Sequence, residues 1–379
     1  MDEPIYFDGF ATTPLAPEAR AAMILASSQP GNPGSPHLSG ARASATLERA
    51  REDVASLVGA DAQELIFTSG ATESDNLAIR GVALWALQSG SSRRKIVVSA
   101  IEHKAVLEAA DSLRNLGFQI IRAPVTKKGV IDIEAAERLI DADTLLVSIM
   151  LANNETGAVQ PVGRIAGIAR LHGALLHCDA AQAAGKIPVE VEALDVDYMS
   201  LSSHKMYGPM GVGALYVANG APRPIPIQFG GGQERAMRPG TEPVYLLAGF
   251  GAAARLAGQR LGDDMAHGQA MAKTFKKDLL ERGIDFDIST GDAETIPGSL
   301  SIYLPNRSAE DIVSSISPYA SISTGSACTS GQIMPSHVLM AMGISPYNAA
   351  SILRIFFGRY NSYHEIDRFL PYFVTAASQ

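Results

Sequence analysis

Ser200-Leu201-Ser202-Ser203-His204-Lys205-Met206-Tyr207-Gly208-Pro209 places a lysine among hydroxyl groups, just before a Gly-Pro turn. Residues 196–199, which precede it, form a largely apolar run typical of a buried strand, so we expect the Lys205 amine to emerge from a sheet edge. An amine held out of water loses its proton more readily and can form a Schiff base with an aldehyde. The alternative is an ordinary turn lysine, and the rest of the chain bears on the choice.

Upstream of this stretch, short apolar segments alternate with segments of helical period. Short apolar strands separated by helices predict a mostly parallel sheet covered on both faces, with ligands beyond the carboxyl ends of the strands. Residues 1–40, rich in Pro, Gly and Ser, are expected to form ordered loops. We expect strands at 64–68, 95–99, 118–121, 144–149 and 174–178, and helices at 41–58, 72–88, 104–116, 133–140 and 162–171.

The chain has 379 residues, a length that favours two domains. A helix rich in Ala and Leu is expected at 245–261, followed by a strand at 298–304 and a helix at 363–373. We therefore predict an α/β protein with a large domain at 15–250. A smaller α+β domain would combine 1–14 with 251–379.

Composition excludes several classes of protein. The net charge of −8 argues against binding to a nucleic-acid backbone. The absence of a signal-like start and of a long apolar run leads us to expect a cytoplasmic protein without membrane contact. Two cysteines exclude a disulfide framework and a four-cysteine metal site, and we expect no metal. Cys178, at the end of an apolar strand, is interpreted as a buried core residue.

Polar residues follow four of the five predicted strands. Ser69-Gly70-Ala71-Thr72 can bind an anion at a helix start, with Thr72 as cap, or can simply cap that helix. His103 can be a catalyst lying flat on a planar ring, or an ordinary loop residue. Asn153-Asn154-Glu155-Thr156-Gly157 can be a plain turn. Asp179 can keep a pyridine nitrogen protonated, or cap a helix. These signals are stronger together than apart.

The chain resembles the cysteine desulfurases, pyridoxal-phosphate enzymes of the class V aminotransferase type. The resemblance covers nearly the whole chain and implies fold type I, a homodimer and L-cysteine as substrate. It is carried by Ala11-Thr12-Thr13-Pro14, Thr68-Ser69-Gly70-Ala71-Thr72-Glu73-Ser74-Asp75-Asn76, Glu102-His103-Lys104-Ala105-Val106-Leu107, Asn153-Asn154-Glu155-Thr156-Gly157, His204-Lys205-Met206-Tyr207-Gly208-Pro209, Arg238-Pro239-Gly240-Thr241 and Gly325-Ser326-Ala327-Cys328.

The resemblance also implies a role for each cofactor contact. Lys205 would hold pyridoxal phosphate covalently, Asp179 would pair with its ring nitrogen, and Gln182 with its ring hydroxyl oxygen. The remaining contacts are to the phosphate, from Ala71, Thr72, Ser202 and His204, with Thr241 reaching across from a second subunit.

On the substrate side, the resemblance implies that His103 stacks on the ring and assists proton transfer. Asn154 and Arg354 would orient the substrate, Arg354 by a bidentate carboxylate contact. Cys328, on a loop rich in Ser, Thr, Gly and Ala that we expect to move, would accept the sulfur as a thiolate. Phe10 stands where the family usually has a small or polar residue, so its ring is expected near the substrate side.

The expected reaction releases alanine and leaves a persulfide on Cys328 for a sulfur-acceptor protein, a scaffold or sulfurtransferase. Iron–sulfur assembly, tRNA thiolation and DNA sulfur modification all stay open as destinations. One alternative is a selenocysteine lyase or another class V lyase or transaminase. An alternative from another class is a non-catalytic sulfur-relay scaffold.

Overall fold

A seven-stranded sheet forms the larger part of the molecule. The computed structural model describes residues 3–325 and 335–378. Within the sheet, β4, β3, β5, β6 and β7 are parallel neighbours, while β8 runs antiparallel to both β7 and β2. In spatial order the strands are β2 (Leu65–Thr68), β8 (Gly213–Val217), β7 (Tyr198–Ser202), β6 (Leu175–Asp179), β5 (Thr144–Ser148), β3 (Lys95–Ser99) and β4 (Gln119–Ala123).

Helices cover both faces of this sheet, which explains why its strands are apolar throughout. On one face, α3 (Ala71–Gln88) and α4 (Lys104–Asp111) share a core with strand residues such as Ile66 and Val98. On the other face, residues such as Phe67 and Val97 pack with four helices. These are α2 (Leu38–Leu57), α5 (Ile133–Leu139), α6 (Val162–Leu171) and the first half of α8 (Val244–Glu281). The predicted mostly parallel, doubly covered sheet is confirmed.

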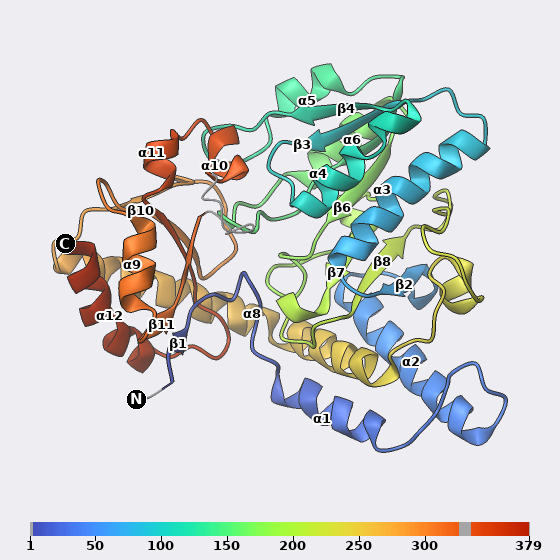
Figure 1. Cartoon of the computed structure of the whole chain (residues 1–379), viewed down its shortest axis with the longest axis horizontal. Helices are drawn as coiled ribbons and strands as arrows, with labels where there is room; N and C mark the ends of the chain where they lie inside the picture. The colour runs from blue at the N-terminus through green and yellow to red at the C-terminus, as the bar shows by residue number, and fades with distance from the viewer. Residues whose placement is uncertain (1–2, 326–334, 379) are drawn as a thin grey trace.

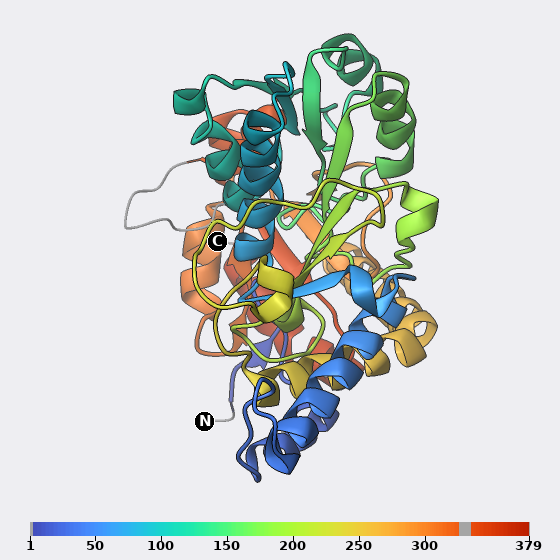
Figure 2. The same cartoon turned by 90° about the vertical axis from the view of Figure 1, so that its right-hand side faces the viewer.

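The smaller part has its own core and its own antiparallel sheet, and α8 runs beneath both parts (Figure 1). Figure 2 shows α8 lying alongside α1 (Pro17–Ser27) and α2. The four-stranded sheet has the order β12 (Ser323–Thr324), β13 (Ile352–Phe356), β10 (Ser299–Tyr303) and β9 (Asp287–Ile288), and β1 (Ile5–Tyr6) pairs with β11 (Ala320–Ser321). The helices here are α9 (Ala309–Ile316), α10 (His337–Ala341), α11 (Pro346–Ala349) and α12 (Tyr363–Ser378).

The structure corrects four local predictions. The segment 1–40 contains α1, whose Ala-rich sequence starts with a proline at its first position. The predicted helix 104–116 ends at Asp111 and is followed by the 3₁₀ turn η2 (Arg114–Leu116). Strand β8 was not predicted. Helix α8 continues to Glu281 because its apolar residues recur every fourth position, at Met271, Phe275 and Leu279, and enter the core of the smaller part.

The predicted domain boundary at residue 250 falls inside α8, so the domain limits stay a prediction. Within residues 3–325 and 335–378, none of the helices combines the length and apolar character needed to cross a membrane.

A buried ion pair ties α2 to the sheet. Arg51 forms two hydrogen bonds of 2.7 Å with Glu234, in the 3₁₀ segment η4 (Gln233–Ala236). Glu234 also accepts from the Phe67 backbone at 2.8 Å, and Arg51 donates to the Leu65 carbonyl at 3.1 Å. Both side chains are buried, so each charge depends on the other.

We predict that Arg51→Ala lowers the free energy of unfolding by about 3–5 kcal/mol, because it leaves the Glu234 carboxylate buried without its partner. Glu52→Ala, an exposed position on the same helix, is the control and should change it by less than about 0.5 kcal/mol. Urea unfolding of both variants checks this, and equal losses would contradict it.

Candidate active site

The Lys205 amine lies at the end of β7, in the 3₁₀ turn η3 (Ser203–Lys205). It donates to the carbonyl oxygens of Phe10 and Ala11, the second at 3.0 Å. Burial lowers the pKa of Lys205 to about 8; the positive charge of Arg354 adds to this effect, and Asp179 opposes it. This amine therefore loses its proton far more readily than an ordinary lysine, as the sequence predicted.

The N-terminal segment fixes the turn that carries Lys205. The backbone N–H and the hydroxyl of Thr13 both donate to the His204 carbonyl at 2.9 Å. The Thr13 hydroxyl also accepts from the Tyr207 backbone at 2.7 Å, and His204 Nδ1 lies 3.0 Å from the Thr12 hydroxyl. Burial lowers the pKa of His204 to about 4, so its ring is neutral near pH 7.

Asp179, at the end of the neighbouring strand β6, and His103, in the loop after β3, both interact electrostatically with Lys205. Asp179 ends β6, is buried, and accepts only the Ala181 backbone N–H, at 2.9 Å, among the hydrogen bonds of the described residues. Burial raises the pKa of Asp179, while His103 and Lys205 counter the rise. His103 caps α4, with Nδ1 accepting from the Ala105 backbone at 3.2 Å. The neutral His103 ring therefore carries its proton on Nε2.

The predicted anion site lies at the start of α3, with one correction. Gly70, at φ 150°, occupies the cap position, so Thr72 is not the cap but an exposed residue in the first turn. A Cβ on Gly213 would lie 2.7 Å from the Gly70 Cα, so these two glycines let the helix start approach β8. Buried Ser202, at the end of β7, pairs with Gly213 across the sheet.

Arg354, on β13, brings the smaller part to the site. Its guanidinium forms a 2.8 Å ion pair with Asp8 and donates to the Asn154 carbonyl at 2.9 Å. Its Nε is buried without a partner among the described residues. The structure therefore places the backbone of Asn154 against Arg354, and it leaves Arg354 with an unused donor for an acidic ligand.

Cys328, Thr241 and Phe10 were also named from the sequence. Cys328 lies outside the described residues. Thr241 is exposed, in the loop that Arg238 ties to α3 through a 3.0 Å ion pair with Glu73. The Phe10 ring is buried, stacks on Phe356 at 5.0 Å and lies 6.0 Å from the Arg354 guanidinium carbon, while the Phe10 backbone carbonyl meets Lys205.

Sequence reasoning missed two charged residues of this region. Asp8 was not among the predicted site residues, yet it pairs with Arg354. Lys186 is buried and donates to the Gln182 side chain. A lysine in the largely apolar run after Asp179 was the only available signal. Cys178 is buried as predicted, and burial raises the pKa of its thiol.

A family model described as Aminotransferase class-V matches residues 5–369. The chain belongs to the class-V aminotransferase family. The match spans both sheets and every described site residue named above. The prediction of the family from seven short motifs is confirmed.

Relatives of this class-V aminotransferase narrow its activity. It is 44% identical over 372 residues to the cysteine desulfurase IscS of Anaeromyxobacter sp. (strain Fw109-5), covering 97% of this chain and 91% of that protein. It is 42% identical over 369 residues to the mitochondrial cysteine desulfurase of Drosophila melanogaster, covering 96% and 79%. A solved structure described as a NifS-like protein matches with a TM-score of 0.91 and 37% identity over 99% of both chains. These findings confirm a cysteine desulfurase of fold type I that depends on pyridoxal phosphate.

The described residues fit this cofactor. Lys205 offers an amine with a lowered pKa, for a covalent link to an aldehyde. Asp179 keeps acceptor capacity for a protonated ring nitrogen, since it takes only one backbone hydrogen bond among those described. The start of α3, an 18-residue helix, supplies backbone N–H groups for a phosphate.

Glu155, next to Asn154, is a buried carboxyl group. It accepts a hydrogen bond from Ser336, which in turn caps α10 through the Leu339 backbone. Burial raises the pKa of Glu155 to about 7, although Ser336 and Arg354 counter the rise. The folded protein therefore holds this proton in a pH range where the unfolded chain, with an ordinary glutamate, has released it.

We predict that this proton makes the protein less stable as pH rises. From pH 5 to pH 8 the parent should lose about 2–3 kcal/mol of unfolding free energy relative to Glu155→Gln, which cannot titrate. Urea unfolding at fixed protein and cofactor concentrations measures the difference. A difference that is constant with pH, or that grows in the parent's favour, would contradict the burial of an ionisable Glu155.

Proposed function

We propose that this cysteine desulfurase passes the sulfur of L-cysteine to Cys328 and from there to an acceptor protein. The observation that carries the proposal is the juxtaposition of a buried amine at Lys205, a carboxyl at Asp179 and an Arg354 guanidinium with a spare donor. When bound, pyridoxal phosphate supplies an electron sink for bonds at the substrate's α carbon. The protein's own residues bind, orient and move protons around it.

Arg354 would bind the substrate carboxylate, exchanging its ion pair with Asp8 for that of the ligand. Asn154 lies against the same guanidinium and would limit where the substrate sits. Lys205, as a free amine, would take the α proton and return a proton to the product. His103 carries a proton on Nε2, which it can donate to a bound group and later take back.

The sulfur step is a displacement. The thiolate of Cys328 attacks the substrate sulfur, so a sulfur–sulfur bond forms and the substrate's carbon–sulfur bond breaks. The electron pair of that bond stays with the substrate fragment, which gains protons and leaves as alanine. Cys328 gains one sulfur atom as a persulfide. The attacking thiol must be deprotonated and accessible, and the polar sequence around Cys328 suits this.

We predict that Cys328→Ala abolishes persulfide formation and lowers sulfide release from L-cysteine at least about a hundredfold, as expected for loss of a nucleophile. Cys178→Ala removes a buried thiol away from the chemistry and is the matched control. Mass spectrometry of each protein after addition of L-cysteine would find one extra sulfur on residue 328 of the parent and the control only. Sulfide release by Cys328→Ala at the parent's rate would overturn the mechanism.

The same experiment separates the alternatives. A selenocysteine lyase, or a transaminase of this family, would keep its activity on its own substrate without Cys328. The non-catalytic scaffold is disfavoured because Lys205, Asp179 and His103 are all present. For the acceptor we propose a scaffold or sulfurtransferase of iron–sulfur assembly, supported by the name of the Anaeromyxobacter relative. We further propose that the protein is cytoplasmic.

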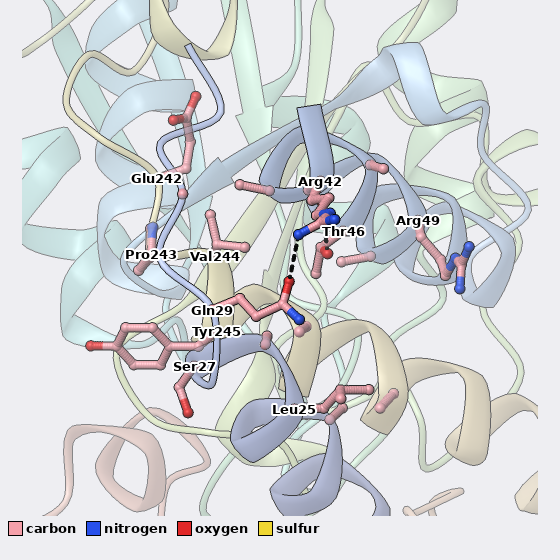
Figure 3. A pocket seen from close by; sticks show the side chains of 18 of the residues that line it. Leu25, Ser27, Gln29, Arg42, Thr46, Arg49, Glu242, Pro243, Val244 and Tyr245 are labelled. Carbon is pink, nitrogen blue, oxygen red and sulfur yellow. Dashed lines mark hydrogen bonds between the residues drawn. The ribbon is translucent and has the colours of Figure 1, made fainter. Parts of the chain in front are cut away.

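We also propose a homodimer, with Thr241 completing the partner's phosphate site. A cavity of about 760 Å³ lies where α1 and α2 meet the start of α8. Figure 3 shows Gln29 bonded to Arg42 in this cavity, with Pro243, Val244 and Tyr245 on one side. Leu25 and Tyr245 expose large apolar surfaces here. Thr241 immediately precedes residues 242–245, which line the cavity. A second copy would cover this surface.

The mass in solution tests this assembly. Light scattering of the cofactor-loaded protein should give twice the 40.0 kDa of one chain. Thr241→Ala should weaken cofactor retention while the dimer persists, because the hydroxyl contributes to the phosphate site alone. A monomeric mass with cofactor still bound would contradict the homodimer.

A further inference from the structure

A second buried lysine lies next to the catalytic one. Lys186 is 6% exposed and donates to Gln182 twice, to its side-chain oxygen at 3.0 Å and to its backbone oxygen at 3.2 Å. The rings of Phe10 and Phe356 lie 5.5 and 5.6 Å from its amine. Burial of an amine is costly unless the amine forms hydrogen bonds, and Gln182 accepts those of Lys186.

The other end of the Gln182 amide reaches the active site. Its Nε2 donates to the Phe10 carbonyl at 2.8 Å, and the Lys205 amine donates to the same oxygen. The two donors therefore converge on one acceptor. Any group attached to the Lys205 amine lies close to the NH₂ group of Gln182.

The chemistry of the partners fixes which way the amide points. A backbone carbonyl can only accept, and the Lys186 amine donates to both oxygens of Gln182. Between Phe10 and Lys186, the Gln182 oxygen must therefore face Lys186 and its NH₂ must face Phe10. The opposite orientation would place two oxygens together at one end and two sets of donor hydrogens at the other.

The backbone holds the two residues in this arrangement. Lys186 follows Gln182 by four positions, in a turn where Ala184 donates to the Ala180 carbonyl at 3.0 Å and Ile187 to the Ala183 carbonyl at 3.1 Å. Gly185, at φ 76°, allows the turn to close. Lys186 is therefore placed over Gln182 without contacting the amine of Lys205 itself.

We propose that Lys186 is a positioning residue that holds the Gln182 amide with its NH₂ group directed at the Phe10 carbonyl and so beside the Lys205 amine. A donor at this place disfavours a proton on the neighbouring nitrogen, whereas an acceptor would favour it. Lys186 thus acts on the proton affinity at Lys205 through Gln182. The inference rests on the proposed function only for its readout, the spectrum of the cofactor joined to Lys205.

The other charged or titratable groups around Lys205 stay unchanged in the test. They are Arg354, Asp179, Asp8, His103 and His204. Removing the Lys186 charge could also act directly through space, since the two amines repel each other. The experiment must therefore separate an effect through Gln182 from a direct effect of charge.

A double-mutant cycle makes this separation. The pH midpoint of the cofactor's visible absorbance is measured in the holoenzyme for the parent, Lys186→Met, Gln182→Met and the double variant. We expect Lys186→Met to raise the midpoint by about one unit, a tenfold change in proton affinity, because the Gln182 oxygen loses its donor and the Phe10 carbonyl alone then holds the amide. Gln182→Met should raise it similarly, and adding Lys186→Met to Gln182→Met should change nothing further. Lys186→Arg, which also only donates, should keep the parent's midpoint.

Two results would overturn the proposal: an unchanged midpoint in Lys186→Met, or a shift as large with Gln182→Met present as without it. If Lys186→Met does not fold, Lys186→Gln takes its place in the cycle, since its amide both donates and accepts and releases the constraint on Gln182. A parent protein without a visible cofactor band would instead refute the proposed function, so the two failures are distinguishable.

Discussion

The Lys205 amine contacts the backbone carbonyls of Phe10 and Ala11, and this contact connects the larger part of the molecule to the N-terminal segment that begins in the smaller part. The segment that supplies these carbonyls begins in the smaller part, where Ile5 and Tyr6 pair with β11. It then crosses to the larger part, where Thr13 fixes the turn at His204. An amine buried in this way needs acceptors, and backbone oxygens supply them without adding a negative charge. The pKa of Lys205 therefore stays low enough for the amine to react.

Around this contact, burial and neighbouring charges lower the pKa of Lys205 and raise that of Asp179. Asp179 opposes the lowering of the Lys205 pKa, and Arg354 reinforces it. Arg354 is itself neutralised by Asp8 from the same N-terminal segment. An acidic substrate that takes the place of Asp8 would keep the Arg354 guanidinium paired with a carboxylate. This exchange gives a physical reason why residues 8–13 and β13 have to meet at the site.

Most of the fold and many of the site residues could be predicted because their signals are local. The apolar strands and the polar residues after them place Asp179, His103 and Lys205 at one edge of the sheet from spacing alone. What escaped prediction depends on contacts between distant segments. The Phe10 carbonyl that meets Lys205 belongs to the backbone, which carries no sequence signature. The length of α8 depends on the core of the smaller part, and the burial of Lys186 depends on its contacts with Gln182, Phe10 and Phe356.

Half-buried Lys205 and buried Lys186 lie near opposite ends of the Gln182 amide, and we assign the cofactor to Lys205 only. Borohydride reduction of the holoenzyme followed by peptide mass spectrometry identifies the lysine that holds pyridoxal phosphate. We predict the adduct on Lys205 alone. An adduct on Lys186, or on neither lysine, would contradict it.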